Sequence, residues 1–234
     1  MSHPIPRRDR LIVALDLPSV ERAIELVDTL GDTVTFYKIG MEMFMGGGYF
    51  DLLADLAKRG KKVFVDLKFF DIPNTVASAV RQLSKWPVEF CTVHGNDAML
   101  GAAAKAAPSV KVLAVTALTS LDQGDLEDLG FQCDVRELVL SRAKRALKLG
   151  CAGVVSSGLE APAVREHTGD ALMIICPGIR PVANTEDQKR TVDVETAFKN
   201  GATYIVVGRP IHGADDPKAA AEAIQSTIAG IFPE

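Results

Sequence analysis

Short apolar runs alternate along the chain with longer segments in which apolar residues recur every three or four positions. The runs have the length of buried strands, and the longer segments have the spacing of helices that cover a sheet. This alternation predicts strands at residues 11–16, 34–40, 63–67, 89–94, 111–116, 151–156, 172–176 and 204–207. Helices are predicted to start at Ser19, near Phe50, at Asn74 and at Asn96, and to span 135–149, 161–167, 193–198 and 217–229, with an irregular or short helical excursion at 118–131.

These alternations, with no linker-like break between them, predict a single (β/α)8 barrel domain over residues 1–234. A doubly wound sheet is the structural alternative. The barrel is favoured because polar residues close several strands, as expected where strand ends converge on one mouth. These residues are Asp16, Lys38, Asp66 with Lys68, His94 and Thr116. For His94, a structural hydrogen bond is the preferred interpretation over proton transfer.

Composition narrows the class of function. With 26 basic and 30 acidic residues, no run of Lys or Arg and few aromatic residues, the chain lacks the features of a nucleic-acid surface. Residues 1–10 lead into no apolar core of signal-peptide length, and no apolar run reaches the roughly 18 residues of a membrane span, so we expect a cytoplasmic protein. The cysteines and histidines are dispersed without zinc-site spacing, so the cysteines are interpreted as buried free thiols.

The stretch 63–75 carries the strongest indication of chemistry. Because side chains alternate across a strand, Asp66 and Lys68 are expected on one side with Cα atoms roughly 6.6 Å apart, a spacing that favours an ion pair. Asp71 follows in a loop ahead of Pro73. A solvated salt bridge would explain an isolated Asp-x-Lys, but the apolar flanks here predict a partly dry site in which unpaired charge is costly.

Two Gly-Arg loops indicate a phosphate site. Arg180 lies in the loop after the seventh predicted strand, and Gly208 and Arg209 lie in the loop after the eighth. In barrels those two loops commonly bind phosphate through backbone N–H groups, and a guanidinium adds a planar, charged donor. The first of them, the long loop 177–191, is predicted to be flexible and to close over the ligand, with Gln188 donating its amide.

These motifs resemble those of the orotidine 5′-monophosphate decarboxylase family, whose reaction completes de novo pyrimidine synthesis. The resemblance covers nearly the whole chain, without departure at a position that the family's motifs require. The matching segments are Ala14-Leu15-Asp16, Tyr37-Lys38-Ile39-Gly40, Asp66 through Thr75, Leu118-Thr119-Ser120, Pro177 through Pro181 with Asp187-Gln188, and Val207 through Pro210. The resemblance implies decarboxylation of orotidine 5′-monophosphate to UMP and CO2 with no cofactor and no metal.

The resemblance also implies contacts to each part of the substrate. Asp16 and Lys38 would hold the ribose hydroxyls, Thr119 and Ser120 would meet the pyrimidine edge, Arg180, Gly208 and Arg209 would take the phosphate, and Gln188 would bridge phosphate and base.

At the reacting carbon, the resemblance implies that Lys68 stabilises the developing carbanion and delivers a proton. Asp66 and Asp71 would keep Lys68 charged and in place, and Lys38 would continue this chain of alternating charges. In the family, the residues matching Asp71 and Thr75 come from the neighbouring subunit. A homodimer with shared active sites is therefore implied.

Two alternatives have less support. The related 3-keto-L-gulonate 6-phosphate decarboxylase and hexulose phosphate synthase share a similar Asp-x-Lys-x-x-Asp, but they use Mg²⁺ held by acids that include one at the end of strand two. This chain has Lys38 there, and a cation in that place opposes a metal. A non-catalytic sensor of phosphate ligands is the other alternative, and the presence of Lys68 between its acids argues for chemistry instead.

Overall fold

The computed structural model describes residues 5–180 and 190–233 and forms a closed barrel of parallel strands in chain order. Within those ranges the strands are β1 (Leu11–Ala14), β2 (Phe36–Gly40), β3 (Lys62–Phe69), β4 (Phe90–His94), β5 (Lys111–Val115), β6 (Gly153–Val155), β7 (Met173–Cys176) and β8 (Tyr204–Val207). Because β1 pairs with both β2 and β8, the sheet has no open edge. The predicted (β/α)8 barrel is confirmed, and the doubly wound alternative is wrong.

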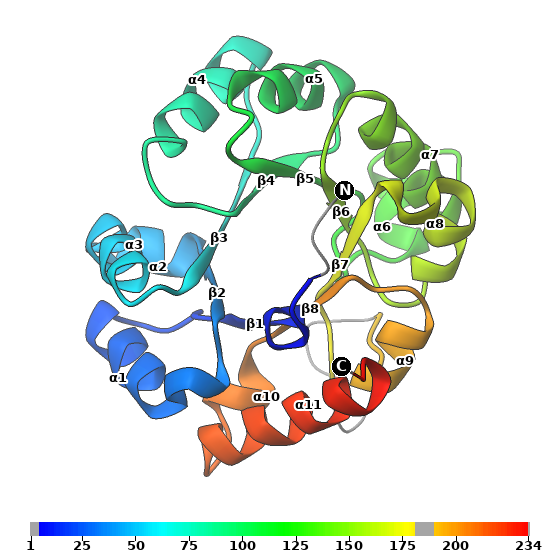
Figure 1. Ribbon diagram of the computed structural model, residues 1–234. Coiled ribbons are helices and arrows are strands. Elements are labelled where there is room, and N and C mark those ends of the chain that lie inside the picture. The colour runs from blue at the N-terminus through cyan, green and yellow to red at the C-terminus, as the bar shows by residue number, and fades with distance from the viewer. Residues whose placement is uncertain (1–4, 181–189, 234) are drawn as a thin grey trace.

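Helices surround the ring of strands on the outside (Figure 1). Over the described ranges they are α1 (Val20–Leu30), α2 (Met41–Gly46), α3 (Tyr49–Lys58), α4 (Pro73–Leu83), α5 (Asp97–Ala106), α6 (Gln123–Asp128), α7 (Val135–Lys148), α8 (Ala161–Thr168), α9 (Val194–Lys199), α10 (Arg209–His212) and α11 (Pro217–Ile231). Short 3-10 segments occupy η1 (Arg7–Arg10), η2 (Gly31–Thr33) and η3 (Gly169–Ala171). None of the helices described here combines the length and apolar character needed to cross a membrane.

The observed helix starts correct one prediction. Asn74 is not the N-cap of α4, because the helix begins at Pro73 and Ile72 takes the cap position. A proline suits the first helical position, where its fixed φ is already helical and its missing N–H has no intrahelical partner to lose. The helix starts predicted at Ser19 and Asp193 are confirmed, since each residue takes the cap position and its side chain accepts a backbone N–H of the first turn.

Three of the cysteines are buried free thiols, as predicted. These are Cys91, Cys151 and Cys176, and burial raises the pKa of each to about 12. Such thiols stay protonated and unreactive at neutral pH. Cys133 is also free but only partly buried, so for this residue the predicted burial is only partly correct.

The interior of the barrel is filled by its own apolar cluster, separate from the layer between strands and helices. At its centre the rings of Phe36, Phe90 and Tyr204 pack with centroids 5.2 to 6.0 Å apart. Because side chains alternate along a strand, the residue two positions after an interior residue is interior as well. Lys38 follows Phe36 in this way, so the aromatic layer carries a charged side chain above it at the C-terminal mouth.

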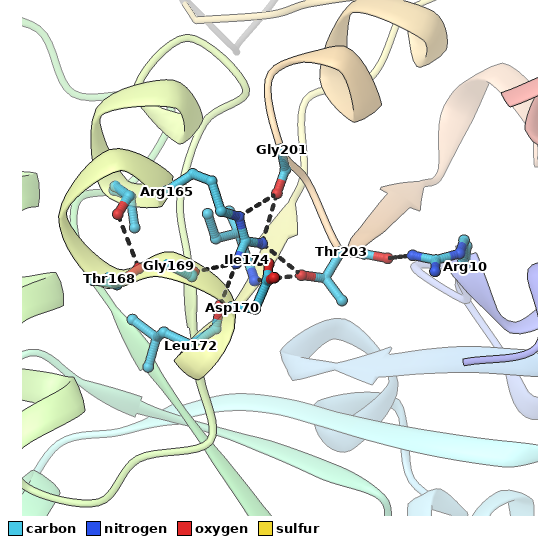
Figure 2. Close-up of polar contacts among 10 residues, drawn as sticks. Arg10, Arg165, Thr168, Gly169, Asp170, Leu172, Ile174, Gly201 and Thr203 are labelled. Carbon is cyan, nitrogen blue, oxygen red and sulfur yellow. Dashed lines mark hydrogen bonds and ion pairs between the residues drawn. The ribbon is translucent and has the colours of Figure 1, made fainter. Parts of the chain in front are cut away.

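At the opposite, N-terminal end of the barrel, the guanidinium of Arg165 joins the loops that lead into β7 and β8 (Figure 2). Its Nη1 donates to the carbonyls of Gly169 and Leu172 at 2.5 and 3.2 Å. Its Nη2 donates to the carbonyl of Gly201 at 2.7 Å and to Thr203 Oγ1 at 3.1 Å. One side chain thus satisfies carbonyls from separate loops.

Thr203 extends this network toward the first strand. Its Oγ1 also accepts the backbone N–H of Ile174 at 3.0 Å, and its carbonyl accepts Arg10 Nη1 at 3.1 Å (Figure 2). The entrances to β1, β7 and β8 are therefore linked by side chains as well as by the sheet, at the end of the barrel far from the charged mouth.

Replacing Arg165 with methionine is expected to lower the free energy of unfolding by about 2 to 3 kcal/mol, because several carbonyls lose a charged donor at once. Chemical denaturation measures this loss. Arg22→Met is the matched control, since the exposed guanidinium of Arg22 pairs with the exposed Glu25 on the same helix, and its effect should stay within about 0.5 kcal/mol. An Arg165→Met protein as stable as Arg22→Met would show that the network adds nothing to stability.

Candidate active site

A cavity of about 480 Å³ opens at the C-terminal ends of the strands. Its floor consists of apolar interior residues, namely Ala14, Phe64, Val115, Val155 and Val206. Its rim carries the charged side chains, which are Asp16, Lys38, Glu42, Asp66, Lys68, Arg180 and Arg209, together with His212. The cavity is therefore dry below and charged above, and its charges come from several strands and loops.

Four of the rim residues, at the C-terminal ends of β1, β2 and β3, form a chain of alternating charge. Lys38 Nζ lies 2.9 Å from Asp16 Oδ1 and 3.5 Å from Asp66 Oδ2, and Lys68 Nζ lies 3.0 Å from Asp66 Oδ1. The side chains of Lys38 and Asp66 are only 10% and 13% exposed. The ion pair predicted between Asp66 and Lys68 is thus present, in surroundings as dry as the sequence indicated.

Gly40, at the end of β2, makes room for this chain of charges. A Cβ atom at position 40 would lie 3.0 Å from Asp16 Oδ1 and 3.1 Å from Lys38 Nζ. Both contacts are tighter than a side chain normally accepts, so an alanine would press on the ion pair. The ion pair between Lys38 and Asp16 therefore favours a residue without a side chain at position 40.

Burial and charge act in opposite directions on the two central groups. Burial disfavours the charged form of Lys38, but the carboxylates of Asp66 and Asp16 outweigh it and raise the pKa above that of an ordinary lysine. For Asp66, burial is likewise outweighed by Lys38 and Lys68, and hydrogen bonds from Lys68 and Thr92 act in the same direction, so its pKa is lowered. Both groups are therefore charged at neutral pH.

The lowered pKa of Asp66 predicts a specific dependence of stability on pH. A carboxylate with a depressed pKa in the folded state contributes stability above its ordinary value of 3.8 and loses it as pH falls through the folded pKa. The difference in unfolding free energy between wild type and Asp66→Asn should therefore be largest above this value and shrink on further acidification. Denaturation curves across the acid range measure it, and a difference independent of pH would contradict the assignment.

The backbone of β3 is strained at Lys68. Its φ of 48° is the only positive value among the non-glycine residues that the structure describes. The pairing of β3 with β4 changes register between Val65 and Phe69, so Lys68 lies in a bulge. Left-handed backbone costs an ordinary residue roughly 1 to 2 kcal/mol, and such strain concentrates at functional positions.

Thr92 on β4 holds this bulge in place. Its Oγ1 accepts the backbone N–H of Lys68 at 2.9 Å and donates to Asp66 Oδ1 at 2.9 Å. Sequence reasoning missed Thr92. It placed His94, two positions later, near the mouth with a structural hydrogen bond as its preferred role, but His94 Nδ1 is buried without a hydrogen-bond partner among the described residues. His94 does not line the described cavity; its ring packs edge-on against Phe70 with centroids 4.8 Å apart. The sequence shows only a threonine within the otherwise apolar run 90–93, and the structure shows that this threonine is fully buried.

Most of the residues predicted to contact the phosphate and the pyrimidine line the cavity. Arg180, Gly208 and Arg209 line it, as does Thr119. Ser120 is exposed and is not part of the lining. Gln188 and the central part of loop 177–191 lie outside the described residues, so their predicted closure over a ligand stays a prediction.

Two further lining residues, Glu42 and His212, were not predicted. His212 lies on α10, directly after the Gly208-Arg209 turn, and Glu42 lies on α2. Burial lowers the pKa of His212, and the positive charge of Arg209 acts in the same direction against the pull of Asp16 and Glu42. The imidazole is therefore mainly neutral at neutral pH, available as one donor and one acceptor.

Asp71 and Thr75 are not brought to the cavity within one chain. Both are exposed, and Asp71 Oδ1 accepts the backbone N–H of its neighbour Ile72 at 2.6 Å. The side chains of Phe70 and Ile72 are exposed as well, at 62% and 66%. The loop after β3 thus presents an acid between two large apolar residues to the outside.

Comparison with known proteins finds relatives over nearly the whole chain. Residues 9–224 match the model of the family described as orotidine 5′-phosphate decarboxylase / HUMPS. An orotidine 5′-phosphate decarboxylase of Methylococcus capsulatus is 61% identical over 231 residues, which cover 98% of this chain and 96% of that protein. One of Xylella fastidiosa is 52% identical over 94% of this chain and 92% of its own.

Solved structures that resemble this chain include members of the same family. The crystal structure of orotidine 5′-phosphate decarboxylase from Lactobacillus acidophilus matches with a TM-score of 0.84 and 38% identity, covering 94% of this chain and 99% of that one. One from Pyrococcus horikoshii matches with a TM-score of 0.77 and 26% identity, over 94% and 99% of the two chains. With a matching family model, two near full-length relatives and the same barrel, the chain belongs to the orotidine 5′-phosphate decarboxylase / HUMPS family.

Proposed function

We propose that this chain decarboxylates orotidine 5′-monophosphate to UMP and CO2 in de novo pyrimidine synthesis. The near full-length identity with relatives named for this activity supports the proposal. The single observation that carries it is the ion pair of Lys68 with Asp66, set in a cavity whose rim also holds Thr119, Arg180 and Arg209.

The reaction needs a fixed cation. Loss of CO2 from C6 of the pyrimidine leaves an electron pair in an sp² orbital orthogonal to the ring π system, so the ring cannot delocalise it. A positioned ammonium stabilises this charge where it develops and then donates a proton to the same carbon. Lys68 fills both roles, and the proposed reaction uses no cofactor and no metal.

Asp66 and Lys38 keep the Lys68 ammonium where the reaction needs it. Asp66 stays ionised because two lysines flank it, and it holds Lys68 Nζ at 3.0 Å. The backbone of Lys68 is fixed independently through Thr92. A charge that is already oriented needs no reorganisation when the carbanion forms, which is the main source of electrostatic catalysis.

Catalysis of this kind also draws on binding energy away from the reacting carbon. Enzymatic rate enhancements reach about 10¹⁷, whereas a general acid supplies roughly 10² to 10⁴. We assign the phosphate to Arg180, Gly208 and Arg209, whose contacts can help to assemble the site around the base. Gln188 remains the predicted bridge between phosphate and base.

The ribose and the pyrimidine are assigned to residues at or just after the ends of β1, β2 and β5. Asp16 and Lys38 are assigned to the ribose hydroxyls, where the carboxylate accepts and the ammonium donates. Thr119 and Ser120 are assigned to the pyrimidine edge. Thr119 already lines the cavity, whereas Ser120 needs a change of the loop after β5 to reach a base.

We further propose that two copies of the chain share their active sites. Asp71 and Thr75 lie outside the cavity of their own chain, and the exposed Phe70 and Ile72 beside them supply apolar surface for a second copy. In the dimer, Asp71 of one chain completes the charged rim around Lys68 of the other. A cytoplasmic location accompanies this proposal as an expectation from the sequence.

The competing function is that of the metal-dependent phosphosugar enzymes that the family name also covers. Lys38 Nζ lies between the carboxylates of Asp16 and Asp66, where its charge repels a divalent cation. The test is the fall in ultraviolet absorbance as orotidine 5′-monophosphate becomes UMP, with and without EDTA. Equal rates support the proposal, no decay refutes it, and decay abolished by EDTA favours the metal-dependent enzymes.

A further inference from the structure

We infer that Arg190 and Glu160 form a positioning pair that sets the spacing between the pyrimidine end and the phosphate end of the cavity. The inference rests on the proposed function, because it uses the assignment of Thr119 to the base and Arg180 to the phosphate. Neither member of the pair lines the described cavity, so any effect on the substrate passes through the loops that they hold.

The guanidinium of Arg190 connects two loops of the rim. Its Nη1 forms an ion pair with Glu160 Oε1 at 2.7 Å, at the start of α8. Its Nη2 donates to the carbonyl of Leu118 at 2.8 Å, directly before Thr119. The side chains of Arg190 and Glu160 are only 11% and 10% exposed. The loop after β5 is thereby fixed to the loop after β6.

The backbone next to Arg190 is fixed to the phosphate end. Val192 accepts the N–H of Arg180 at 3.0 Å and donates its own N–H to the carbonyl of Gly178 at 3.3 Å. Ser157 Oγ donates to the carbonyl of Arg190 at 3.4 Å. From residue 190 to residue 192, the chain thus joins the carbonyl before Thr119 to the backbone of Arg180.

A glycine allows this segment to lie close to the loop after β6. A Cβ atom at Gly158 would lie 2.4 Å from Cγ2 of Val192, a distance that real side chains do not reach. The carbonyl of Gly158 also accepts Asn200 Nδ2 at 2.8 Å. The loop after β6 therefore packs tightly against residue 192, and a side chain at position 158 would push the two apart.

The pair is poorly arranged for stability alone. Among the described residues, Arg190 Nε and Glu160 Oε2 are buried without a hydrogen-bond partner. A buried ion pair adds little net stability even when fully satisfied, since desolvation offsets the attraction. Its geometric effect is independent of that balance, because a planar guanidinium holds two acceptors at fixed directions.

The affinity of a ligand that is bound at both ends of the cavity depends on the spacing between them, whereas the affinity of a ligand bound at one end does not. UMP spans both ends, and uridine and ribose 5-phosphate each retain one. If the spacing changes, UMP loses the advantage of joining the two contacts in one molecule, while each fragment adapts to its own end.

The test compares these three ligands by titration calorimetry or competition. Arg190→Lys keeps a cation beside Glu160, but one ammonium cannot also hold the Leu118 carbonyl in the same fixed geometry. We expect the dissociation constant of UMP to rise about tenfold in Arg190→Lys and more in Arg190→Met, with those of uridine and ribose 5-phosphate changing less than about threefold. Arg190→Lys also keeps the experiment decisive if Arg190→Met fails to fold.

Arg165→Met is the matched control, because Arg165 likewise links loops through carbonyls but at the opposite end of the barrel. It should lose stability and keep the UMP affinity of the wild type. Unchanged UMP affinity in Arg190→Lys, or equal losses for UMP and both fragments, would overturn the inference alone. Wild-type protein that neither binds UMP nor turns over the substrate would overturn the proposed function, and this inference with it.

Discussion

Replacing Lys68 with alanine is expected to reduce kcat for orotidine 5′-monophosphate by at least about 10³-fold in a protein that still folds. The substitution removes both the cation that stabilises the carbanion and the proton that quenches it. Binding contacts elsewhere on the rim remain, so UMP should still bind. Steady-state assays at a raised enzyme concentration, with the substrate still in excess, measure the residual rate, and UMP titration measures the retained affinity.

Lys68→Gly is the matched control for folding. Both variants lack the ammonium and differ only at a backbone position with φ of 48°, where glycine carries no steric penalty. Lys68→Gly should therefore be more stable than Lys68→Ala by about 1 kcal/mol and equally inactive. Activity above about a tenth of wild type in either variant would be incompatible with the role assigned to Lys68.

Two inactive variants are expected to restore activity when combined, if the active sites are shared. In a shared site Lys68 comes from one chain and Asp71 from the other. A dimer of one Lys68→Ala chain and one Asp71→Ala chain therefore has both lesions in one site and neither lesion in the other. Each mixed dimer holds one intact site of its two, so the purified mixed dimer should regain about half of wild-type activity. Co-expression of the two chains with different tags, followed by assay of the purified mixed dimer, measures this recovery.

The control combination is Lys68→Ala with Asp66→Ala. These two residues contact each other at 3.0 Å within one chain, so every site in a mixed dimer carries one of the two lesions. No activity should return. Recovery in the control, or none with Asp71→Ala in a protein that is dimeric by light scattering, would refute the shared site; a monomeric wild type would refute the dimer itself.

The barrel was predictable because parallel strands buried on both faces leave continuous apolar runs. Tyr204–Val207 is such a run, and every residue in it is buried. Helix starts were less predictable where two signals competed. Asn74 is a good cap by itself, but Pro73 before it fits the first helical position, and local propensity does not decide between them.

The charged mouth was predictable to the extent that it follows strand alternation. Asp66 and Lys38 were identified because each stands at the apolar-to-polar end of a run. Thr92 was missed because its role depends on the register between β3 and β4, which no local pattern encodes. Asp71 lies outside the cavity of its own chain, so only a second copy can test the role assigned to it.

The left-handed backbone at Lys68 restricts how this mouth can be redesigned. Residues branched at Cβ, such as valine, isoleucine and threonine, are excluded there by their own side chains, whatever their chemistry. Asparagine, aspartate and glycine tolerate that conformation best. A library that introduces a different acid, base or nucleophile into this barrel therefore has few productive choices at position 68, and it gains more diversity from neighbouring strands whose backbone is relaxed.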